Sequence, residues 1–164
     1  MMTENVDPTI QNEENYEDLL VTIEASQGVL AILIAVCDYG NFRDEIIARY
    51  EAELAPEIRN YRVELPRGEP SMRAAIAEVV QKDEYLQNGG KAVFTVTGAE
   101  KLFLLKLGAE RSEQEIFFGY LQWTREALRE FRYPIILWVT NQLLVELSKK
   151  APDFWSWRKG VFRF

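Results

Sequence analysis

Residues 29–37 read VLAILIAVC, an apolar run that lies between Gly28 and Asp38. A continuously apolar run of this length is typical of a strand that is covered on both faces, as in a parallel sheet. Two further runs have the same character, AVFTV at 92–96 and PIILWV at 134–139. We therefore expect these three segments to be strands of one mainly parallel sheet.

Helical segments separate the predicted strands. Residues 59–65 alternate between apolar and polar and predict another strand, and the end of the segment 151–164 predicts an edge strand. Apolar residues at helical spacing, with glycine or proline at the breaks, predict the helices. These predicted helices cover residues 16–26, 42–54, 71–87, 99–107, 112–129 and 142–149. The alternation predicts the α/β class, a three-layer, open, mainly parallel sheet flanked by helices on both faces.

The composition excludes several kinds of catalytic and metal site. The chain has 164 residues, which favours one domain, and its 48% hydrophobic and 27% charged residues are typical of globular proteins. It has no histidine, which excludes a Ser-His-Asp triad, a Cys-His dyad and His-ligated zinc. Cys37 is the single cysteine, so an intrachain disulfide and a cysteine-cluster metal site are excluded too. We expect Cys37 to be a buried structural residue.

Acidic residues are concentrated at the start of the chain. The formal net charge is −7, and residues 1–18 hold six acids and no Lys or Arg. We expect an acidic, disordered leader over 1–18 and a single domain over 19–164. The leader lacks the features of a signal peptide, and no apolar run is long enough to span a membrane, so we expect a cytoplasmic protein with no membrane partner. The nearly neutral body argues against nucleic acid as the partner.

In sheets of this kind, ligands bind beyond the carboxyl ends of the strands. A phosphate-binding loop would place G-x-x-x-x-G-K-[ST] after the first strand, where backbone amides, a lysine and a helix start hold phosphates. The sequence at 35–47 is instead AVCDYGNFRDEII, with one glycine and no lysine. Asp38, Asp44 and Glu45 stand there against a single cation, Arg43, and would repel a triphosphate unless a metal intervened.

The next two apolar strands also lack clear catalytic ends. AVFTV ends in Thr97-Gly98, and the nearest acid, Glu100, is expected to be a helix-start charge rather than a metal ligand. The strand PIILWV ends in Thr140-Asn141, a polar pair like that of an ATPase sensor strand, although either residue could simply cap the next helix. The degenerate nucleotide-site positions are Asp38, Gly40, Asn41, Arg43, Thr97, Gly98, Glu100, Thr140 and Asn141.

Four runs carry a resemblance to a known family. They are RDEIIARYEAELAP, AVFTVTGAEKL, FFGYLQWTREALREF and the tail PIILWVTNQLLVELSKKAPDFWSWRKGVFRF, of which APDFWSWR is the most specific part. From about Leu19 to Phe164 the chain resembles the N-terminal NTPase-like domain, related to AAA and STAND-type ATPases, that precedes tetratricopeptide repeats in many cyanobacterial proteins. The resemblance implies a P-loop NTPase-like fold without its phosphate loop. It also implies repeats after Phe164, so we expect either a piece of a longer protein or a stand-alone relative.

The segment 154–164, FWSWRKGVFRF, interleaves aromatic and basic residues. Its aromatic side chains could pack on the sheet while the basic groups stay in water. The segment could also contact a protein, because aromatic residues and Arg are enriched at interfaces, or stack on single-stranded nucleic acid. The candidate interaction residues are Phe154, Trp155, Trp157, Arg158, Lys159 and Phe162.

The preferred hypothesis is a non-catalytic NTPase-like module that acts in protein–protein interaction or regulation. It needs no cofactor, metal or catalytic residue, and its partner would be a protein, such as a repeat domain or a second copy. The alternative is an NTP-binding switch that takes ATP or GTP with Mg²⁺. In that switch Asn41 and Arg43 would meet the phosphates, Asp38 would hold the metal, and Thr140 and Asn141 would sense the γ-phosphate. A weaker alternative is single-stranded nucleic-acid binding through the C-terminal segment.

Overall fold

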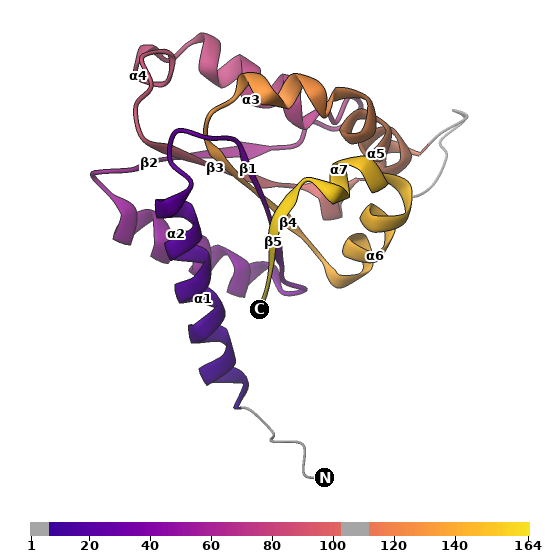
Figure 1. Cartoon of the computed structure of the whole chain (residues 1–164). Coiled ribbons are helices and arrows are strands. Elements are labelled where there is room, and N and C mark those ends of the chain that lie inside the picture. The colour runs from indigo at the N-terminus through magenta and orange to yellow at the C-terminus, as the bar shows by residue number, and fades with distance from the viewer. Residues whose placement is uncertain (1–6, 103–111) are drawn as a thin grey trace.

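Five strands form one sheet in the computed structural model, which describes residues 7–102 and 112–164. Their spatial order is β2-β3-β4-β1-β5, and each neighbouring pair is parallel (Figure 1). The strands span Ala31–Val36 (β1), Arg59–Glu64 (β2), Ala92–Thr97 (β3), Pro134–Val139 (β4) and Arg158–Arg163 (β5). Since β5 lies at one edge, the predicted edge strand at the end of the chain is confirmed.

Helices cover both faces of this sheet. The α-helices span Pro8–Ala25 (α1), Gly40–Leu54 (α2), Met72–Gln81 (α3), Glu84–Gln87 (α4), Glu113–Thr124 (α5), Asn141–Lys150 (α6) and Pro152–Ser156 (α7), and 3₁₀ turns span Ala99–Lys101 (η1) and Glu126–Glu130 (η2). α1 and α2 pack on one face, and α3, α5, α6 and α7 pack on the other (Figure 1). The three-layer prediction is therefore confirmed.

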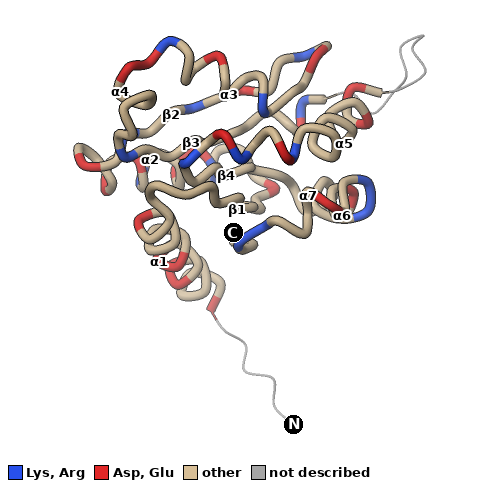
Figure 2. Tube along the Cα trace, turned by 45° about the horizontal axis from the view of Figure 1, so that its top comes forward, with Lys and Arg blue, Asp and Glu red and all other residues tan. Residues whose placement is uncertain are grey.

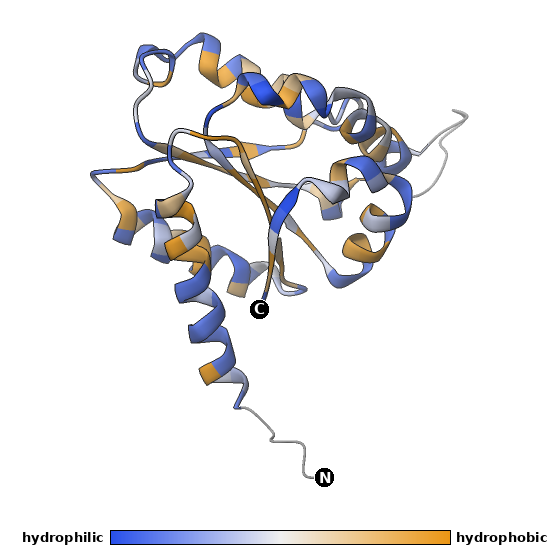
Figure 3. Cartoon of the chain, in the orientation of Figure 1, coloured by the Kyte–Doolittle hydropathy of each residue, from blue (hydrophilic) through white to orange (hydrophobic). Residues whose placement is uncertain are grey.

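Strand β1 shows why its sequence is apolar throughout. Its even-numbered residues pack in the core beneath α3, α5, α6 and α7, and its odd-numbered residues pack in the core beneath α1 and α2. Successive side chains of a strand point to opposite faces, so a central strand with helices on both sides needs apolar residues at every position. The same apolar character runs along the central strands in Figure 3.

The expected disordered leader over residues 1–18 is wrong from Pro8 onward, because Pro8 begins helix α1. Asp7 caps the helix by accepting the N–H of Thr9 at 2.9 Å. Farther along, Tyr16 is buried, and the guanidinium of Arg49 lies 3.9 Å from the centre of its ring. Helix α1 has no basic residue, and its acidic residues thus lie along an ordered helix (Figure 2). Within the described residues, no helix combines the length and apolar character needed to cross a membrane.

The helix predicted over 71–87 divides into α3 and α4. α3 ends at Gln81, and Asp83 then caps α4 by accepting the N–H of Leu86 at 3.2 Å. A capping carboxylate such as that of Asp83 favours the start of a new helix over the continuation of the preceding one. The apolar spacing does not register this break and therefore predicts one continuous helix.

The helix predicted over 112–129 begins as expected but changes form. Ser112 caps the helix by accepting the N–H of Glu115 at 3.1 Å, and the α-helix ends at Thr124 before η2. The helix predicted over 99–107 is a 3₁₀ turn at Ala99–Lys101, and its residues from 103 onward lie outside the described part of the chain.

Candidate functional site

The structure brings the predicted strand ends together at the carboxyl edge of the sheet. Only residues 37–39 separate β1 from α2, and only Thr140 separates β4 from α6. A phosphate-binding loop needs a longer glycine-rich segment whose backbone amides wrap the anion. These connections are too short to form one.

Asp38 and Asn141 close the space between β1 and β4. The Asp38 carboxylate accepts the backbone N–H of Asn141 at 2.9 Å and its side-chain N–H at 3.0 Å. Both hydrogen bonds hold the pKa of Asp38 below its ordinary value. The Thr140 hydroxyl caps α6 by accepting the N–H of Leu143 at 3.3 Å, so the capping role considered from the sequence is confirmed for Thr140.

Arg43 and Glu100 close the neighbouring space between α2 and η1. An Arg43 guanidinium nitrogen lies 2.8 Å from a carboxylate oxygen of Glu100, and a second nitrogen lies 3.0 Å from Asp44. The Arg43 side chain is only 16% exposed. Its charge is therefore already compensated by protein carboxylates, and Glu100, in the 3₁₀ turn η1, is an ion-pair partner of Arg43.

The cavity between these two pairs is small. It measures about 40 Å³ and lies between Asp38, Arg43, Glu100 and Thr140, with Trp138 behind them. Pockets that hold cofactors and other small ligands usually measure about 300–1,000 Å³. The cavity has room for a water molecule or two, but not for a nucleotide, in this arrangement of side chains.

The other predicted positions at this edge are structural or exposed. Gly98 has a φ of +99°, and a Cβ there would lie 3.0 Å from the Glu64 side chain and 3.2 Å from the backbone nitrogen of Leu65. The Thr97 carbonyl accepts that same Leu65 N–H at 2.9 Å. Gly40 begins α2 with open space around it, and Asn41 is exposed. Among the described residues, no group of three or more Cys, Asp and Glu side chains could hold a metal ion.

Cys37 is buried and donates its thiol to the Tyr39 carbonyl at 3.3 Å. Burial raises the pKa of this thiol, which keeps it protonated and unreactive at neutral pH. The structural role predicted for Cys37 agrees with this environment.

The C-terminal segment 154–164 divides between core and surface. Phe154 and Phe162 are buried, so their prediction as interaction residues is wrong: both side chains are occupied by packing within the fold. Trp155 and Trp157 are half-buried, each beneath an arginine, with Arg158 4.1 Å above Trp155. Arg158 and Lys159 are exposed at the start of β5, and the Lys159 amine donates to the Ser26 hydroxyl at 2.8 Å.

Trp123 on α5 is 86% exposed and was not among the residues predicted from the sequence. Phe117, Phe118 and Leu121 form the buried face of this helix. A residue two positions after Leu121 is about 200° further round the helix, on the side opposite that face. The signal was available in the sequence, because Trp123 breaks the apolar spacing of its helix.

The comparisons with known proteins support the fold alone. No family model matches the chain, and no curated protein matches it. The chain is similar to the solved structure of the Aeropyrum pernix ORC2 protein in ADPNP and ADP complexes, with 11% sequence identity and a TM-score of 0.51. The match covers 99% of this chain and 50% of that one, so the chain spans half the length of its neighbour. The chain thus has a three-layer, P-loop NTPase-like α/β fold, as the sequence predicts.

Proposed function

We propose that this chain is a non-catalytic NTPase-like module that acts through protein contacts. The observation that carries the proposal is the closed carboxyl edge, where the Asp38–Asn141 and Arg43–Glu100 pairs leave a cavity of about 40 Å³. Catalysis on a nucleotide triphosphate requires groups that cradle the phosphates and position Mg²⁺. Here the side chains at the corresponding positions bind one another.

The alternative is an NTP-binding switch, and the fold neighbour favours it, since that protein was solved in ADPNP and ADP complexes. In this chain such a switch would have to break both pairs before phosphates could reach Arg43. Each pair contains a charge-assisted hydrogen bond, which a ligand would need to replace. A titration with Mg²⁺-ATP, with Arg43→Ala as the diagnostic variant, decides between the two functions.

Trp123 is the residue that best supports a protein contact. A tryptophan that is 86% exposed leaves a large apolar side chain in water, and tryptophan is among the residues that dominate binding energy at protein interfaces. Gly119 lies one helical turn before it and has no atom within 4 Å of its Cβ position, so a partner could approach the helix backbone. Trp155 and Trp157 of the predicted interaction segment stay candidates for a second contact.

The nature of the partner follows from the family resemblance. Domains of the resembled family precede tetratricopeptide repeats, so a repeat domain is the favoured partner and a second copy of the chain is the other. In both cases we expect the interface to be centred on an aromatic anchor, with Trp123 as the first candidate.

Site-specific crosslinking tests this function. A photoreactive residue at position 123 should crosslink one defined protein, or a second copy, in the cells that make the chain. A photoreactive residue at the exposed position Val145 on α6 serves as the control. The purified partner should bind the unmodified chain and Val145→Ala equally and bind Trp123→Ala at least tenfold more weakly. Equal binding by all three would remove Trp123 from the interface.

A further inference from the structure

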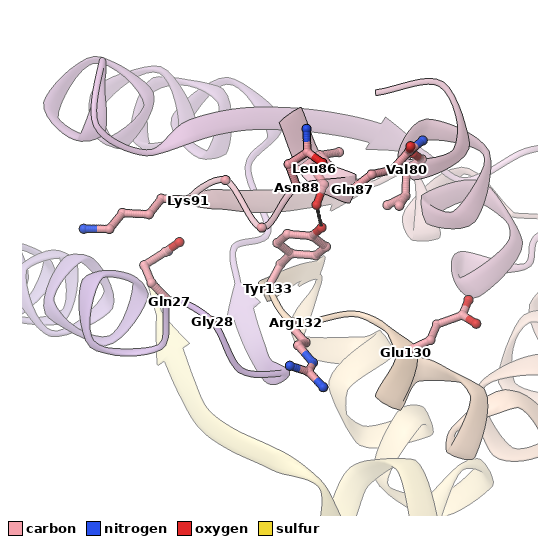
Figure 4. Close-up of a pocket in the computed structure, with 12 residues that line it drawn as sticks. Gln27, Gly28, Val80, Leu86, Gln87, Asn88, Lys91, Glu130, Arg132 and Tyr133 are labelled. Carbon is pink, nitrogen blue, oxygen red and sulfur yellow. Dashed lines mark hydrogen bonds between the residues drawn. The ribbon is translucent and has the colours of Figure 1, made fainter. Parts of the chain in front are cut away.

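A large pocket lies at the amino edge of the sheet, opposite the carboxyl edge that the Asp38–Asn141 and Arg43–Glu100 pairs close. It measures about 800 Å³, within the range of small-molecule sites. Three connections that lead into strands line it (Figure 4). They are the turn at Gln27 and Gly28 before β1, the loop 87–91 before β3, and residues 130–133 before β4.

The walls of this amino-edge pocket are fixed by hydrogen bonds. Gln27 accepts the backbone N–H of Ala92 at 2.9 Å and donates to the Ile23 carbonyl at 3.1 Å. Tyr133 is almost fully buried, and its hydroxyl donates to the Leu86 carbonyl, as the dashed line in Figure 4 marks. A ligand would therefore meet a preformed surface with an aromatic ring in it, which lowers the entropic cost of binding.

Gly89 and Gly90 allow the backbone conformation of the loop that carries Lys91. Gly89 has a φ of +80°, and a Cβ on Gly90 would clash with the Tyr85 ring. Tyr85 also donates its hydroxyl to the Lys91 carbonyl at 2.7 Å. The loop conformation thus depends on residues without side chains, and it holds Lys91 at the pocket.

Within the described part of the chain, the two cations that line the pocket have no carboxylate as an ion-pair partner. Neither Lys91 nor Arg132 forms an ion pair with any residue the structure describes, and the nearby Glu130 is taken by Arg73 at 2.7 Å. In Figure 4 the two side chains project from separate walls, with Lys91 near Gln27 and Arg132 beside Tyr133. Two uncompensated cations at one concave surface raise the local potential and attract an anion.

Among the described residues, cations without an ion pair also lie at the starts of β2 and β5. Within residues 7–102 and 112–164, the cations that form no ion pair are Arg59, Lys91, Arg132, Lys149, Arg158, Lys159 and Arg163. All of these except Lys149 and Arg163 lie within two residues of the start of a strand. At the carboxyl edge, Arg43 and Lys101 are both paired with glutamates, and Arg163 at the end of β5 forms no ion pair with a described residue.

We propose that the amino-edge pocket binds a small organic phosphate. Arg132 can hold phosphate oxygens with its guanidinium fork, and Lys91 can supply a second charge. The aromatic ring of Tyr133 and the apolar side chains of Val80 and Leu86 offer contact to the organic part. This ligand site is separate from the degenerate nucleotide site, and it gives the module a means of responding to a metabolite without hydrolysing it.

The test is a titration of ¹⁵N-labelled protein with AMP and with pyrophosphate, and with citrate as a carboxylate probe. The amide signals of Gly28, Gly89, Gly90 and Arg132 should move saturably with the two phosphates. Lys91→Ala and Arg132→Ala should each weaken AMP binding about tenfold. Lys149→Ala, which removes another unpaired cation, is the matched control and should bind as the unmodified protein does.

Three results would overturn the proposal: no shift of these signals with either phosphate, shifts that persist in both pocket variants, or saturable binding of citrate alone. Binding at the degenerate site is recognised separately, because it would move the signals of residues 39–43 and would be lost in Arg43→Ala. A failure of this proposal is therefore distinguishable from a failure of the proposed function.

Discussion

Asp38 at the end of β1 binds both the backbone and the side chain of Asn141 at the start of α6, at 2.9 and 3.0 Å. The two residues are 103 positions apart in the sequence and meet because β1 and β4 are parallel neighbours. In the sequence both are candidates for a nucleotide site. In the structure the aspartate acts as an additional cap for α6 and takes the place that a phosphate would occupy at a helix N-terminus.

The Asp38 cap predicts a dependence of stability on pH. The pKa of Asp38 is lowered in the fold, so its contribution is present above the unfolded pKa and is lost as the pH falls through the folded pKa. Asp38→Asn should be about 1 kcal/mol less stable than the unmodified protein near neutral pH. The difference should shrink below about pH 4, as measured by urea unfolding at several pH values. A difference that stays constant into acid would contradict the assigned role.

Two glycines at the carboxyl edge should respond oppositely to the same substitution. Gly98→Ala should destabilise the fold by about 1–3 kcal/mol, because its φ of +99° and the contacts with Glu64 and Leu65 disfavour a Cβ. Gly40→Ala should stabilise it by about 0.4–1 kcal/mol, because α2 accepts alanine there and the space around it is open. Thermal unfolding measures both, and equal effects would show that Gly98 is not constrained.

A buried polar network joins α2 to the sheet. The Tyr50 hydroxyl forms a hydrogen bond with the Thr95 hydroxyl and accepts the indole N–H of Trp138 at 3.3 Å. Tyr50→Phe should cost about 1–3 kcal/mol of unfolding free energy, since it leaves both partners buried without a hydrogen bond. Tyr39→Phe is the matched control, because Tyr39 is 76% exposed, and it should leave the stability unchanged. If Tyr50→Phe leaves the unfolding free energy unchanged, water or another group must form hydrogen bonds with Thr95 and Trp138 in the variant.

Substitutions of a buried and an exposed aromatic residue should have very different effects on the unfolding free energy. Phe154→Ala removes a fully buried side chain and should destabilise the protein by about 3–5 kcal/mol. Trp123→Ala changes an exposed side chain and should alter the unfolding free energy by less than about 0.5 kcal/mol. Chemical denaturation of both variants checks this contrast. A large loss of stability in Trp123→Ala would remove the argument that Trp123 is reserved for a partner.

The sheet and its layers follow from local patterns in the sequence. Burial on both faces makes a central strand apolar at every position, so β1 and β4 stand out without any knowledge of their partners. The start of α1 does not stand out, because its order depends on Tyr16 packing under Arg49, a contact between distant segments. Without knowledge of the Tyr16–Arg49 contact, the acidic residues of α1 are typical of a disordered tail in solvent.

The sequence predicts where the degenerate nucleotide site lies but not that its side chains are paired with one another. Strand ends mark the carboxyl edge, and the missing glycines and lysine exclude a standard phosphate loop. The pairing of Asp38 with Asn141 and of Arg43 with Glu100 requires the tertiary structure, as does the burial of Phe154. The amino-edge pocket is assembled from three distant connections, and in the sequence its glycines only indicate the end of a helix.

Calorimetric titration with Mg²⁺-ATP and Mg²⁺-GTP tests most directly whether the carboxyl edge is closed to nucleotides. The unmodified protein and Arg43→Ala should give the same isotherm, and any weak heat should disappear in Arg132→Ala because it arises at the amino-edge pocket. Micromolar binding that is abolished by Arg43→Ala and kept by Arg132→Ala would contradict the account and establish a nucleotide switch.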